Sequence, residues 1–561
     1  MLISILAIIY ISFICWTWGS STLYIFNYTK PYNILHSFGI TCFIGLIVIT
    51  ILGLWTSLFL PLGKYYLHFF LLAPIFIIFY NKHVKSQLDE TLKELIKFDF
   101  RHTIILLLIF LLLLIIHSWT IIHPDTLGYH SQIIQWIGSY KIIPGLSHLN
   151  ERLSLQSSWF IASSLFSFQF LGSGTIFLNI TVCFWFVIFL IDRSHTCSNE
   201  GKSTESILWI GLLAITLWSY TQIRLTVSSF SPDFIACIAI LLLFYLLLNN
   251  FKNQKETNNI FSAILIAFTF TLKISAIPLA ILEIILLKNI FKKNNLITGT
   301  IVSTICIFIV LPFLIRNFVT SGYPLYPTNI LSFRLPNWAL PLDKIRNTEE
   351  YITAYARTES LSDLISIKHS LQLPVKEWIP IWWGHRSTSD KFILVLTSLS
   401  LLIQSIYIVY KKNVADKRKL FIITILLFCI VFWAWKAPDP RFGWGYILTI
   451  LCYNIHTIFC RLNITVSKKI IDFTFFSLLL ILSISIVYRI SKYSNFKMLF
   501  VPLGVEKGAY TRTSCKGQIY FIPKNLEASG NTSLPCTIVP CDEFEKRGNS
   551  LENGFKLKNH P

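Results

Sequence analysis

Ionisable and aromatic side chains gather in one short stretch of this chain, which reads His123-Pro124-Asp125-Thr126-Leu127-Gly128-Tyr129-His130. The stretch directly follows an apolar run, Thr103 to Ile122, that is long enough to cross a bilayer. Polar groups are costly at that depth, so a cluster of them indicates a function. A carboxylate there is suited to act as a general base, which makes Asp125 a candidate catalytic residue. Two alternatives stay open: Asp125 as a helix N-cap, and a divalent-metal site built from His123, Asp125 and His130.

Further ionisable residues stand at the ends of other apolar runs, namely Asp233, Lys273, Arg316, Lys436, Asp439 and Arg441. Carboxylates and cations on one face would serve a reaction that needs an acid or base and releases an anionic group. Structural interpretations stay open beside this one. They are Asp233 as a helix N-cap, Lys273 extending to the membrane interface, Arg316 anchored on lipid phosphate, and Asp439 with Arg441 as a local ion pair.

The hydrophobic content sets the class of protein. Of the 561 residues, 54% are hydrophobic and 14% are charged, whereas a soluble domain has about a quarter of its residues charged. A spanning helix needs about 20 mostly apolar residues, so we predict an all-α polytopic membrane protein with about fourteen transmembrane helices. The segments are 2–18, 36–59, 65–81, 103–122, 174–192, 206–221, 232–248, 259–272, 275–287, 297–314, 391–410, 420–434, 444–460 and 469–488. The first has no basic n-region or cleavage site and is predicted to be a retained helix.

The net charge of +20 is distributed in a way that argues against a nucleic-acid partner. Lys and Arg concentrate in short connections, and such loops lie on the cytoplasmic side of a membrane. These connections lie within 82–101, 252–255, 288–293, 411–419 and 461–469. With all of them inside, the segments 123–173, 222–231, 315–390 and 436–443 and the tail from 490 face outward. The candidate residues then share the extracytoplasmic side.

We divide the chain into N-terminal helices with a charged cytoplasmic segment (1–102), a core of helices (103–314) with a first outer loop (123–173), a large outer loop (315–390), C-terminal helices (391–489) and an outer tail (490–561). In the first outer loop, an amphipathic helix is expected from Asp125 to about Tyr140, lying along the outer membrane surface. Its apolar face would carry Leu127, Ile133, Ile134 and Ile137.

The tail and the tryptophans of the outer loops give further expectations. Turn residues in the tail leave room for short strands such as 518–522. Cys515, Cys536 and Cys541 suit one disulfide in an oxidising compartment, with the pairing open because their number is odd. The tryptophans at 378, 382, 383 and 444 are typical of an interfacial aromatic belt, with sugar stacking as the alternative.

Several short motifs resemble those of the GT-C superfamily of polytopic membrane glycosyltransferases. One is an Asp in the first large outer loop, here in the context Asp125-x-x-x-Tyr129-His130. Another resembles the "RN…SGNP-YP" segment of many bacterial members, here Arg316-Asn317 followed by Ser321-Gly322-Tyr323-Pro324-Leu325-Tyr326-Pro327, with Tyr323 where Asn is common. Ser231-Pro232-Asp233 and Asp439-Pro440-Arg441-Phe442 are also similar to elements of that group. The resemblance spans about residues 100–450, and the stretch from His123 to Phe160 resembles an uncharacterised bacterial membrane-protein family within or close to it.

The resemblance implies a GT-C-like fold in the bacterial inner (cytoplasmic) membrane with an active site that faces outward. Such enzymes move a hexosyl or pentosyl group from a polyprenyl-phosphate-linked donor to a glycan, lipid or protein acceptor of the cell envelope. Asp125 is then the base candidate, with its pKa raised toward the working pH by partial burial. Many members carry two adjacent acids in this loop, so a second carboxylate is expected from Asp233 or Glu151.

The resemblance also assigns substrate-binding roles. Lys273, Arg316 and Arg441 are expected to bind the leaving phosphate, and Tyr129, His130, Tyr326 and Asp439 to line the substrate site. It indicates no specific metal or cofactor. The glycosyltransferase hypothesis would lose its main support if Asp125, Asp233 and Arg316 did not line one outward cavity.

Alternatives from other functional classes are a polytopic transporter or flippase, and a non-catalytic assembly protein of GT-C-like fold. A transporter would favour acids near helix centres and inverted repeats.

Overall fold

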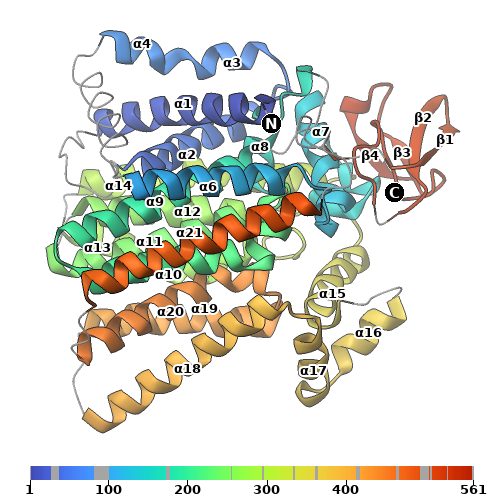
Figure 1. The fold of residues 1–561 in the computed structure, drawn as a ribbon. Coiled ribbons are helices and arrows are strands. Elements are labelled where there is room, and N and C mark those ends of the chain that lie inside the picture. Colours follow the sequence, from blue (N-terminus) through green and yellow to red (C-terminus); the bar gives the residue numbers. More distant parts are fainter. Residues whose placement is uncertain are drawn as a thin grey trace.

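The computed structural model describes residues 2–26, 37–80, 100–171, 177–253, 256–293, 296–332, 335–359, 364–411, 417–462, 466–492, 504–505, 508–526 and 528–558. Most of them form helices that run side by side across the molecule (Figure 1). The long helices are α1 (Leu2–Ile25), α2 (Phe38–Thr56), α6 (Phe100–His117), α9 (Phe177–Asn199), α10 (Ser203–Trp218), α11 (Asp233–Asn253), α12 (Glu256–Leu272), α13 (Ala280–Lys293), α14 (Leu296–Ser321), α18 (Thr388–Lys411), α19 (Lys417–Lys436), α20 (Pro440–Arg461) and α21 (Lys468–Ser491).

Each predicted apolar segment contains a helix, but the helix of segment 103–122 ends at His117 and that of segment 36–59 ends at Thr56. The segment expected at 65–81 divides into α3 (Tyr66–Leu71) and α4 (Ala73–Tyr80). In the described part of the chain, 9 helices are long and apolar enough to cross a membrane. A tenth span results if α10 and the π-helix η6 (Tyr220–Val227), which meet at 57°, count as one. The chain is therefore an integral, multi-pass membrane protein. The larger number of fourteen spans stays a prediction.

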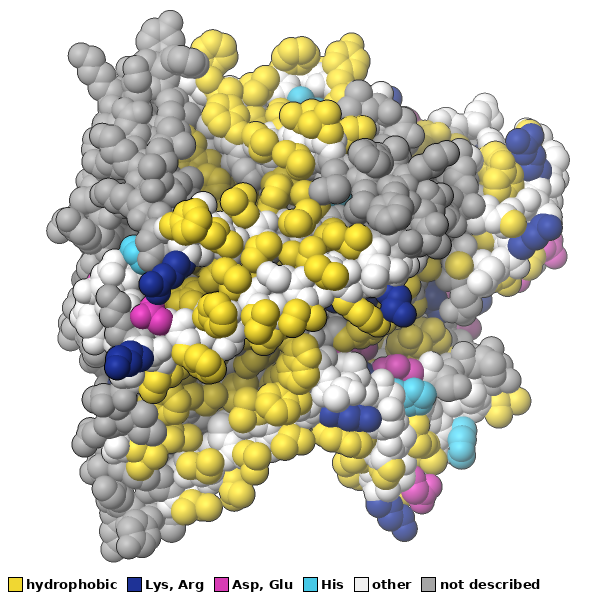
Figure 2. Space-filling view, viewed as in Figure 1, with side chains coloured by type: hydrophobic (Ala, Val, Ile, Leu, Met, Phe, Trp, Pro, Cys, Tyr) yellow, Lys and Arg dark blue, Asp and Glu magenta, His cyan; other side chains and the backbone are white. Residues whose placement is uncertain are grey.

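The surface of the bundle fits this assignment. Hydrophobic side chains cover the sides of the helices, and charged side chains lie mainly toward the two ends (Figure 2). The end of α18 and the start of α21, which border stretches of the sequence rich in Lys and Arg, lie at the left of Figure 1. The outer-loop helices and the C-terminal strands lie at the right.

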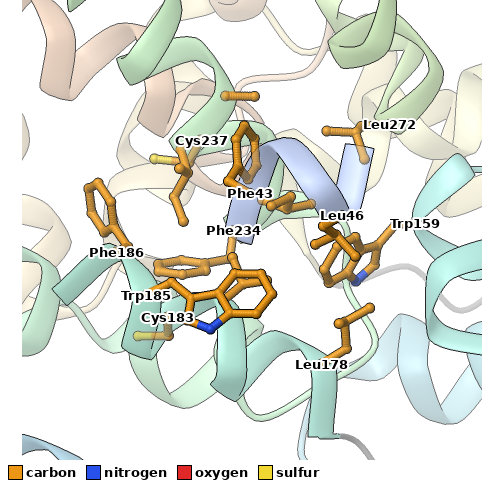
Figure 3. Packing of buried hydrophobic residues seen from close by; sticks show 14 of the residues in the cluster. Phe43, Leu46, Trp159, Leu178, Cys183, Trp185, Phe186, Phe234, Cys237 and Leu272 are labelled. Carbon is orange, nitrogen blue, oxygen red and sulfur yellow. The ribbon is translucent and has the colours of Figure 1, made fainter. Parts of the chain in front are cut away.

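Close backbone contacts hold the N-terminal helices together. A Cβ on Gly45 of α2 would lie 1.8 Å from the Cys15 carbonyl oxygen of α1, and one on Gly19 of α1 would lie 1.9 Å from the Thr41 carbonyl oxygen. Small residues at a crossing let two membrane helices pack backbone to backbone. Around this pair, Phe43 of α2 packs in the same core as Trp185 of α9 (Figure 3).

A buried amide connects this core to the turn that precedes α11. Asn179 of α9 accepts a hydrogen bond from the Trp159 indole at 2.7 Å. Its Nδ2 donates to the carbonyl oxygens of Thr226 and Ser231, each at 2.9 Å. Burial of a polar side chain is favourable only when its hydrogen bonds are satisfied. Asn179 thus fixes the turn that leads into α11 and positions its first residue, Asp233.

The first outer loop contains short elements: η2 (Thr126–His130), α7 (Ser131–Ser139), η3 (Leu146–His148), η4 (Glu151–Ser154), α8 (Ser158–Leu165) and η5 (Gln169–Leu171). The helix expected up to about Tyr140 is confirmed, but its placement along the membrane surface is wrong. Ile133, Ile134 and Ile137 are at most 3% exposed and belong to the protein core. Their apolar face packs against protein instead of lipid, with α8 as a neighbour.

The segment predicted as one large outer loop is mostly helical. α14 continues beyond residue 314 to Ser321, and α15 (Leu342–Thr358), α16 (Leu364–Gln372) and α17 (Val375–His385) follow. Between α12 and α13 lies the short 3-10 helix η7 (Ile274–Leu279), at the end of the bundle where α14 ends and α15 begins. These elements surround the end of the helices that lies at the right of Figure 1.

The tail folds into a small β unit, which we define as residues 508–558. β1 (Tyr510–Cys515) pairs antiparallel with β2 (Gln518–Pro523), and β3 (Phe544–Lys546) pairs with β4 (Phe555–Leu557), with η8 (Leu551–Asn553) before it. The strand predicted at 518–522 is therefore confirmed. A disulfide joins Cys515 to Cys541 and leaves Cys536 free and buried.

The glycine contact predicts a position-specific loss of stability. Gly45→Ala should lower the melting temperature of the detergent-solubilised chain, because the new methyl group must push α1 and α2 apart at a cost of about 1–3 kcal/mol. Gly211→Ala on α10 is the matched control, since a Cβ there meets nothing within 4 Å. Differential scanning fluorimetry checks both, and equal melting temperatures for the two variants would contradict the close crossing.

Candidate functional site

A cavity of about 830 Å³ lies at the end of the bundle that carries the loop 123–173 and α15. Its wall is built from η2, η4, η7, α15 and the start of α20, elements that are far apart in the sequence. Most of the predicted site residues line it, namely Asp125, Tyr129, His130, Asp233, Lys273, Tyr326, Asp439 and Arg441. The expected co-location on one face is therefore present in the structure.

Arg441 is the central cation of this cavity. Asp439 caps α20, accepting from the Arg441 backbone N–H at 2.9 Å, and Pro440 takes the first helical position. The Arg441 side chain folds back onto the same carboxylate, with Nε 2.9 Å and Nη2 2.8 Å from Oδ2. The predicted local ion pair is confirmed. Nη1 remains for other partners and donates to Asp125 Oδ2 at 3.1 Å.

Asp125 points into the cavity and does not cap a helix. Its backbone is helical and its side chain makes no capping hydrogen bond, so the N-cap interpretation is wrong. Burial by itself would raise the pKa of Asp125, but the Arg441 guanidinium holds that pKa well below its ordinary value. The expected upward shift is thus wrong for this arrangement, in which Asp125 is a carboxylate paired with a fixed cation.

The two histidines near Asp125 are buried and neutral. Burial, followed by repulsion from Arg441, lowers the pKa of His123 to about 4, and burial lowers the pKa of His130 to about 3. His123 Nε2 lies 3.0 Å from Arg441 Nη1, and its Nδ1 faces the Thr126 backbone N–H at 3.3 Å. Both partners are donors, so a neutral His123 accepts from only one of them at a time.

His130 lines the cavity from the far side of the η2 turn. Its Nδ1 lies 3.1 Å from the Thr126 hydroxyl, and its ring packs 4.9 Å from Phe160. Within the described residues, no His, Cys, Asp or Glu side chains form a group of three or more suited to hold a metal ion. The metal site considered for His123, Asp125 and His130 therefore has no geometric support there.

Asp233 and Lys273 form a second charged pair in the cavity. The first residue of α11, Asp233, accepts from the Ser231 hydroxyl at 2.8 Å and forms an ion pair with Lys273 Nζ. Lys273 also lies 3.4 Å above the Phe442 ring, so it is held inside the protein and does not extend to the membrane interface as one interpretation had it. Asp233 Oδ2 is 4.0 Å from His123 Nε2, and His123 Nε2 lies 3.0 Å from the Arg441 Nη1 that binds Asp125, so Asp233 is linked to the Asp125 cluster.

Glu151, the other candidate second carboxylate, belongs to the outer part of the cavity. It pairs with Lys344 at 3.4 Å and accepts from the Thr348 hydroxyl at 3.0 Å. Tyr326 OH lies 3.1 Å from that same hydroxyl. Lys344 and Thr348 come from α15, a helix that the sequence reasoning did not predict. Apolar residues recur at helical spacing in this charged segment, a pattern that predicts an amphipathic helix.

Arg316 does not line this cavity, and its predicted phosphate-binding role is not supported. Its Nη1 donates to the Ser57 hydroxyl at 2.8 Å and its Nε to Gln156 Oε1 at 3.3 Å. It is 4% exposed, which also argues against an anchor on lipid phosphate. The reason is that α14 continues to Ser321, so Arg316 lies within the helix and not at its end.

The predicted tryptophan belt is also wrong in part. Trp444 is 1% exposed and belongs to the protein core. The Trp382 indole donates to the Pro438 carbonyl oxygen at 2.7 Å, which fixes the segment before Asp439. The predicted tryptophans are absent from the described cavity wall, so sugar stacking on them is not supported.

Arg386 is a site-related residue that the sequence reasoning missed. It forms an ion pair with Glu359, and its Nη1 lies 4.0 Å from Asp439 Oδ1. Charges of alternating sign thus extend from the end of α15 to Asp125 through Arg386, Asp439 and Arg441. The lining residues include the carboxylates Asp125, Glu151, Asp233, Glu349 and Asp439 and the cations Arg152, Lys273, Lys344, Lys436 and Arg441. Their formal charges balance.

A family model described as a domain of unknown function, DUF8201, matches residues 1–448. The chain belongs to this family. The DUF8201 range includes the predicted site residues from Asp125 to Arg441, whereas the β unit lies beyond it. No curated protein and no solved structure matches the chain significantly.

The buried histidines predict a loss of stability on acidification. His123 and His130 stay neutral in the folded protein down to a pKa of about 4 and about 3, whereas in the unfolded chain they bind a proton near pH 6.5. Above pH 6.5 the two histidines are neutral in both states and do not lower the free energy of unfolding. Below pH 6.5 the free energy of unfolding decreases, by about 2 kcal/mol per histidine at pH 5. The melting temperature at pH 7.5 and at pH 5 measures this effect. His130→Gln should reduce the difference, and an unchanged difference in that variant would contradict the neutral assignment.

Proposed function

We propose that this chain is a membrane glycosyltransferase of the GT-C type, which moves a sugar from a polyprenyl-phosphate-linked donor to an acceptor outside the cytoplasm. The observation that carries the proposal is the cavity itself. It gathers Asp125, Asp233, Lys273 and Arg441 from separate segments at the end of a membrane helix bundle. Buried carboxylates and cations at such a place are costly and favour a functional role.

The side of the cavity that approaches the bundle is apolar. Ile274, Ile277 and Phe432 line it from η7 and α19. Neighbouring residues of the helices on either side have large exposed fractions, such as 65% for Val431 and 45% for Ile281. An isoprenoid chain is compatible with these surfaces because it would lie along exposed apolar side chains while its headgroup reaches the charged part of the cavity.

The proposed reaction uses Asp125 as the acceptor of one proton. The acceptor oxygen forms a bond to the anomeric carbon, and the bond between that carbon and the phosphate oxygen breaks. Asp125 takes the proton of the acceptor hydroxyl, and the electron pair of the broken bond leaves with the polyprenyl phosphate. Lys273 and Arg441 stabilise the negative charge that develops on the leaving oxygen.

The pairing of Asp125 with Arg441 affects this step. A carboxylate held by a guanidinium is a weak base, because the cation favours its ionised form. A phosphate group that binds Arg441 would compete with Asp125 for Nη1 and weaken this effect. The proposed order is therefore donor binding first and proton transfer second.

Two observations favour a non-catalytic function, either transport or assembly. Arg316, one of the three residues expected to line the cavity of a glycosyltransferase, is absent from the cavity wall. The cavity carboxylates Asp125, Glu151, Asp233, Glu349 and Asp439 each have a cationic partner within 4.0 Å. Such mutual pairing suits a structural network as well as a catalytic site. The Asp125 variant described next separates these functions.

Asp125→Asn should abolish sugar transfer, because an amide cannot accept the proton of the acceptor hydroxyl. The expected result is loss of the corresponding envelope glycan, measured by mass spectrometry in a deletion strain that carries the variant at wild-type membrane abundance. Asp343→Asn, an exposed acid on α15 outside the cavity wall, is the matched control. A wild-type glycan profile with Asp125→Asn would eliminate the base role.

The proposed orientation predicts which ends of the helices are accessible. A cysteine at Lys292 near the end of α13 should be shielded from an impermeant maleimide in intact cells, whereas one at Asp343 should react. Both positions are exposed, so accessibility depends on the side of the membrane alone. The Cys460→Ser background removes a native exposed thiol. The reverse labelling pattern would place the cavity in the cytoplasm.

A further inference from the structure

The β unit makes direct contact with the loop that carries the cavity residues. The Gly530 backbone N–H donates to the Leu127 carbonyl oxygen at 2.6 Å. In return, the Ser131 hydroxyl and Gln132 Nε2 donate to the Gly530 carbonyl oxygen at 2.8 and 3.1 Å. Gln132 Nε2 also donates to the Thr532 carbonyl oxygen at 2.8 Å. These bonds hold the turn that begins at Asp125.

A second contact lies along η3 and η4. The Ile538 backbone N–H and the Thr537 hydroxyl both donate to the Leu149 carbonyl oxygen at 3.1 Å. The next loop residues, Asn150 to Arg152, line the cavity. Ile538 and Val539 of the β unit line it too. The β unit therefore contributes apolar side chains directly to the cavity wall.

A third contact depends on two glycines. The Phe555 backbone N–H donates to the Pro144 carbonyl oxygen at 2.9 Å. Gly554 has φ +87°, and a Cβ there would lie 2.2 Å from that same oxygen. Gly145 has φ +63°, and its Cβ would lie 2.1 Å from the Phe555 carbonyl oxygen. The two segments thus approach backbone to backbone, which only glycine permits.

The segment that reaches the cavity is held within the β unit. The Cys515–Cys541 disulfide spans a sequence separation of 26 and encloses residues 528–539. Closing such a loop restricts the conformations that the segment can adopt. Its backbone is tied further by the Thr537 N–H, which donates to the Phe521 carbonyl oxygen of β2 at 3.0 Å.

We propose that the β unit is part of the binding site, although it lies outside the DUF8201 range. Ile538 and Val539 form the outer wall that limits the size of the polar group admitted, and Gly530 with Thr532 positions the Asp125 turn. The existence of the wall does not depend on the proposed glycosyl transfer. Its selection of the sugar-bearing end of a lipid does rest on that function.

The wall is tested first by thiol accessibility in the full-length chain. Val539→Cys should react with a large polyethylene-glycol maleimide about tenfold more slowly than Ile519→Cys, since opening of the contact must precede reaction. Ile519 lies in β2 of the same unit and is 50% exposed, which makes it the matched control. Peptide mass spectrometry locates the label. Equal labelling rates at the two positions would show that Val539 is not part of a closed cavity wall.

The hydrogen bonds to the Asp125 turn are tested in the same assay. Gln132→Leu removes the bonds to Gly530 and Thr532, so in combination with Val539→Cys it should raise the labelling rate toward that of the Ile519→Cys variant. Gln518→Leu is the control, because its amide donates to the neighbouring Ile519 carbonyl oxygen at the exposed edge. If the Gln132→Leu protein does not accumulate in the membrane, Thr537→Val is used in its place, because it removes the hydrogen bond from the Thr537 hydroxyl to the Leu149 carbonyl oxygen. An unchanged rate in the variant that accumulates would show that these bonds do not hold the β unit.

Ligand selection is tested by native mass spectrometry of the chain in nanodiscs with two probes, undecaprenyl phosphate and undecaprenyl-phosphate hexose. Val539→Trp should weaken binding of the hexose-bearing probe by about tenfold, equivalent to about 1.4 kcal/mol, and leave the sugar-free probe unchanged. Equal weakening of both probes, or none, would overturn selection by the wall. Failure of the wild-type chain to bind either probe would refute both this ligand selection and the proposed donor. The thiol assay would still test whether the β unit forms part of the cavity wall.

Discussion

The structure of the cavity end of the bundle depends on one buried guanidinium. Arg441 donates to Asp439 on its own helix and to Asp125 of the first outer loop, which is more than 300 residues earlier in the chain. A buried charge is tolerated only when its partners replace the lost water, and removing one partner leaves the other uncompensated. The start of α20 and the Asp125 turn are therefore held together by electrostatics that neither segment satisfies alone.

The apolar bundle provides the rigid frame for this polar network. Asn179 fixes the approach to Asp233 from within the core, and Trp382 fixes the segment before Asp439. Both use hydrogen bonds to backbone carbonyl oxygens, which set the position of a loop more narrowly than apolar packing does. Lys273 and Arg441 consequently line one cavity beside the same Phe442 ring, although they come from different halves of the chain.

The same electrostatics link binding to chemistry in the proposed reaction. In the absence of an anion, Arg441 keeps Asp125 ionised and weakly basic. An anionic donor that engages Arg441 would both neutralise the cation and release the carboxylate for proton transfer. Ile538 and Val539 of the β unit also line this cavity and give that part of its wall an apolar character.

The sequence by itself determined the membrane class, the positions of the apolar helices and eight of the residues that line the cavity. Apolar runs longer than a bilayer is thick have few alternatives to helix, and charges at their ends, such as Asp125 and Arg441, must meet at an interface. What only the tertiary structure decided were the partners of those charges. Arg316 is buried because α14 continues beyond it. Arg386 belongs to the charged network because it forms an ion pair with Glu359. The β unit contacts the Asp125 turn through Gly530 and lines the cavity with Val539. Such contacts join residues distant along the chain, and local periodicity carries no information about which distant surfaces meet.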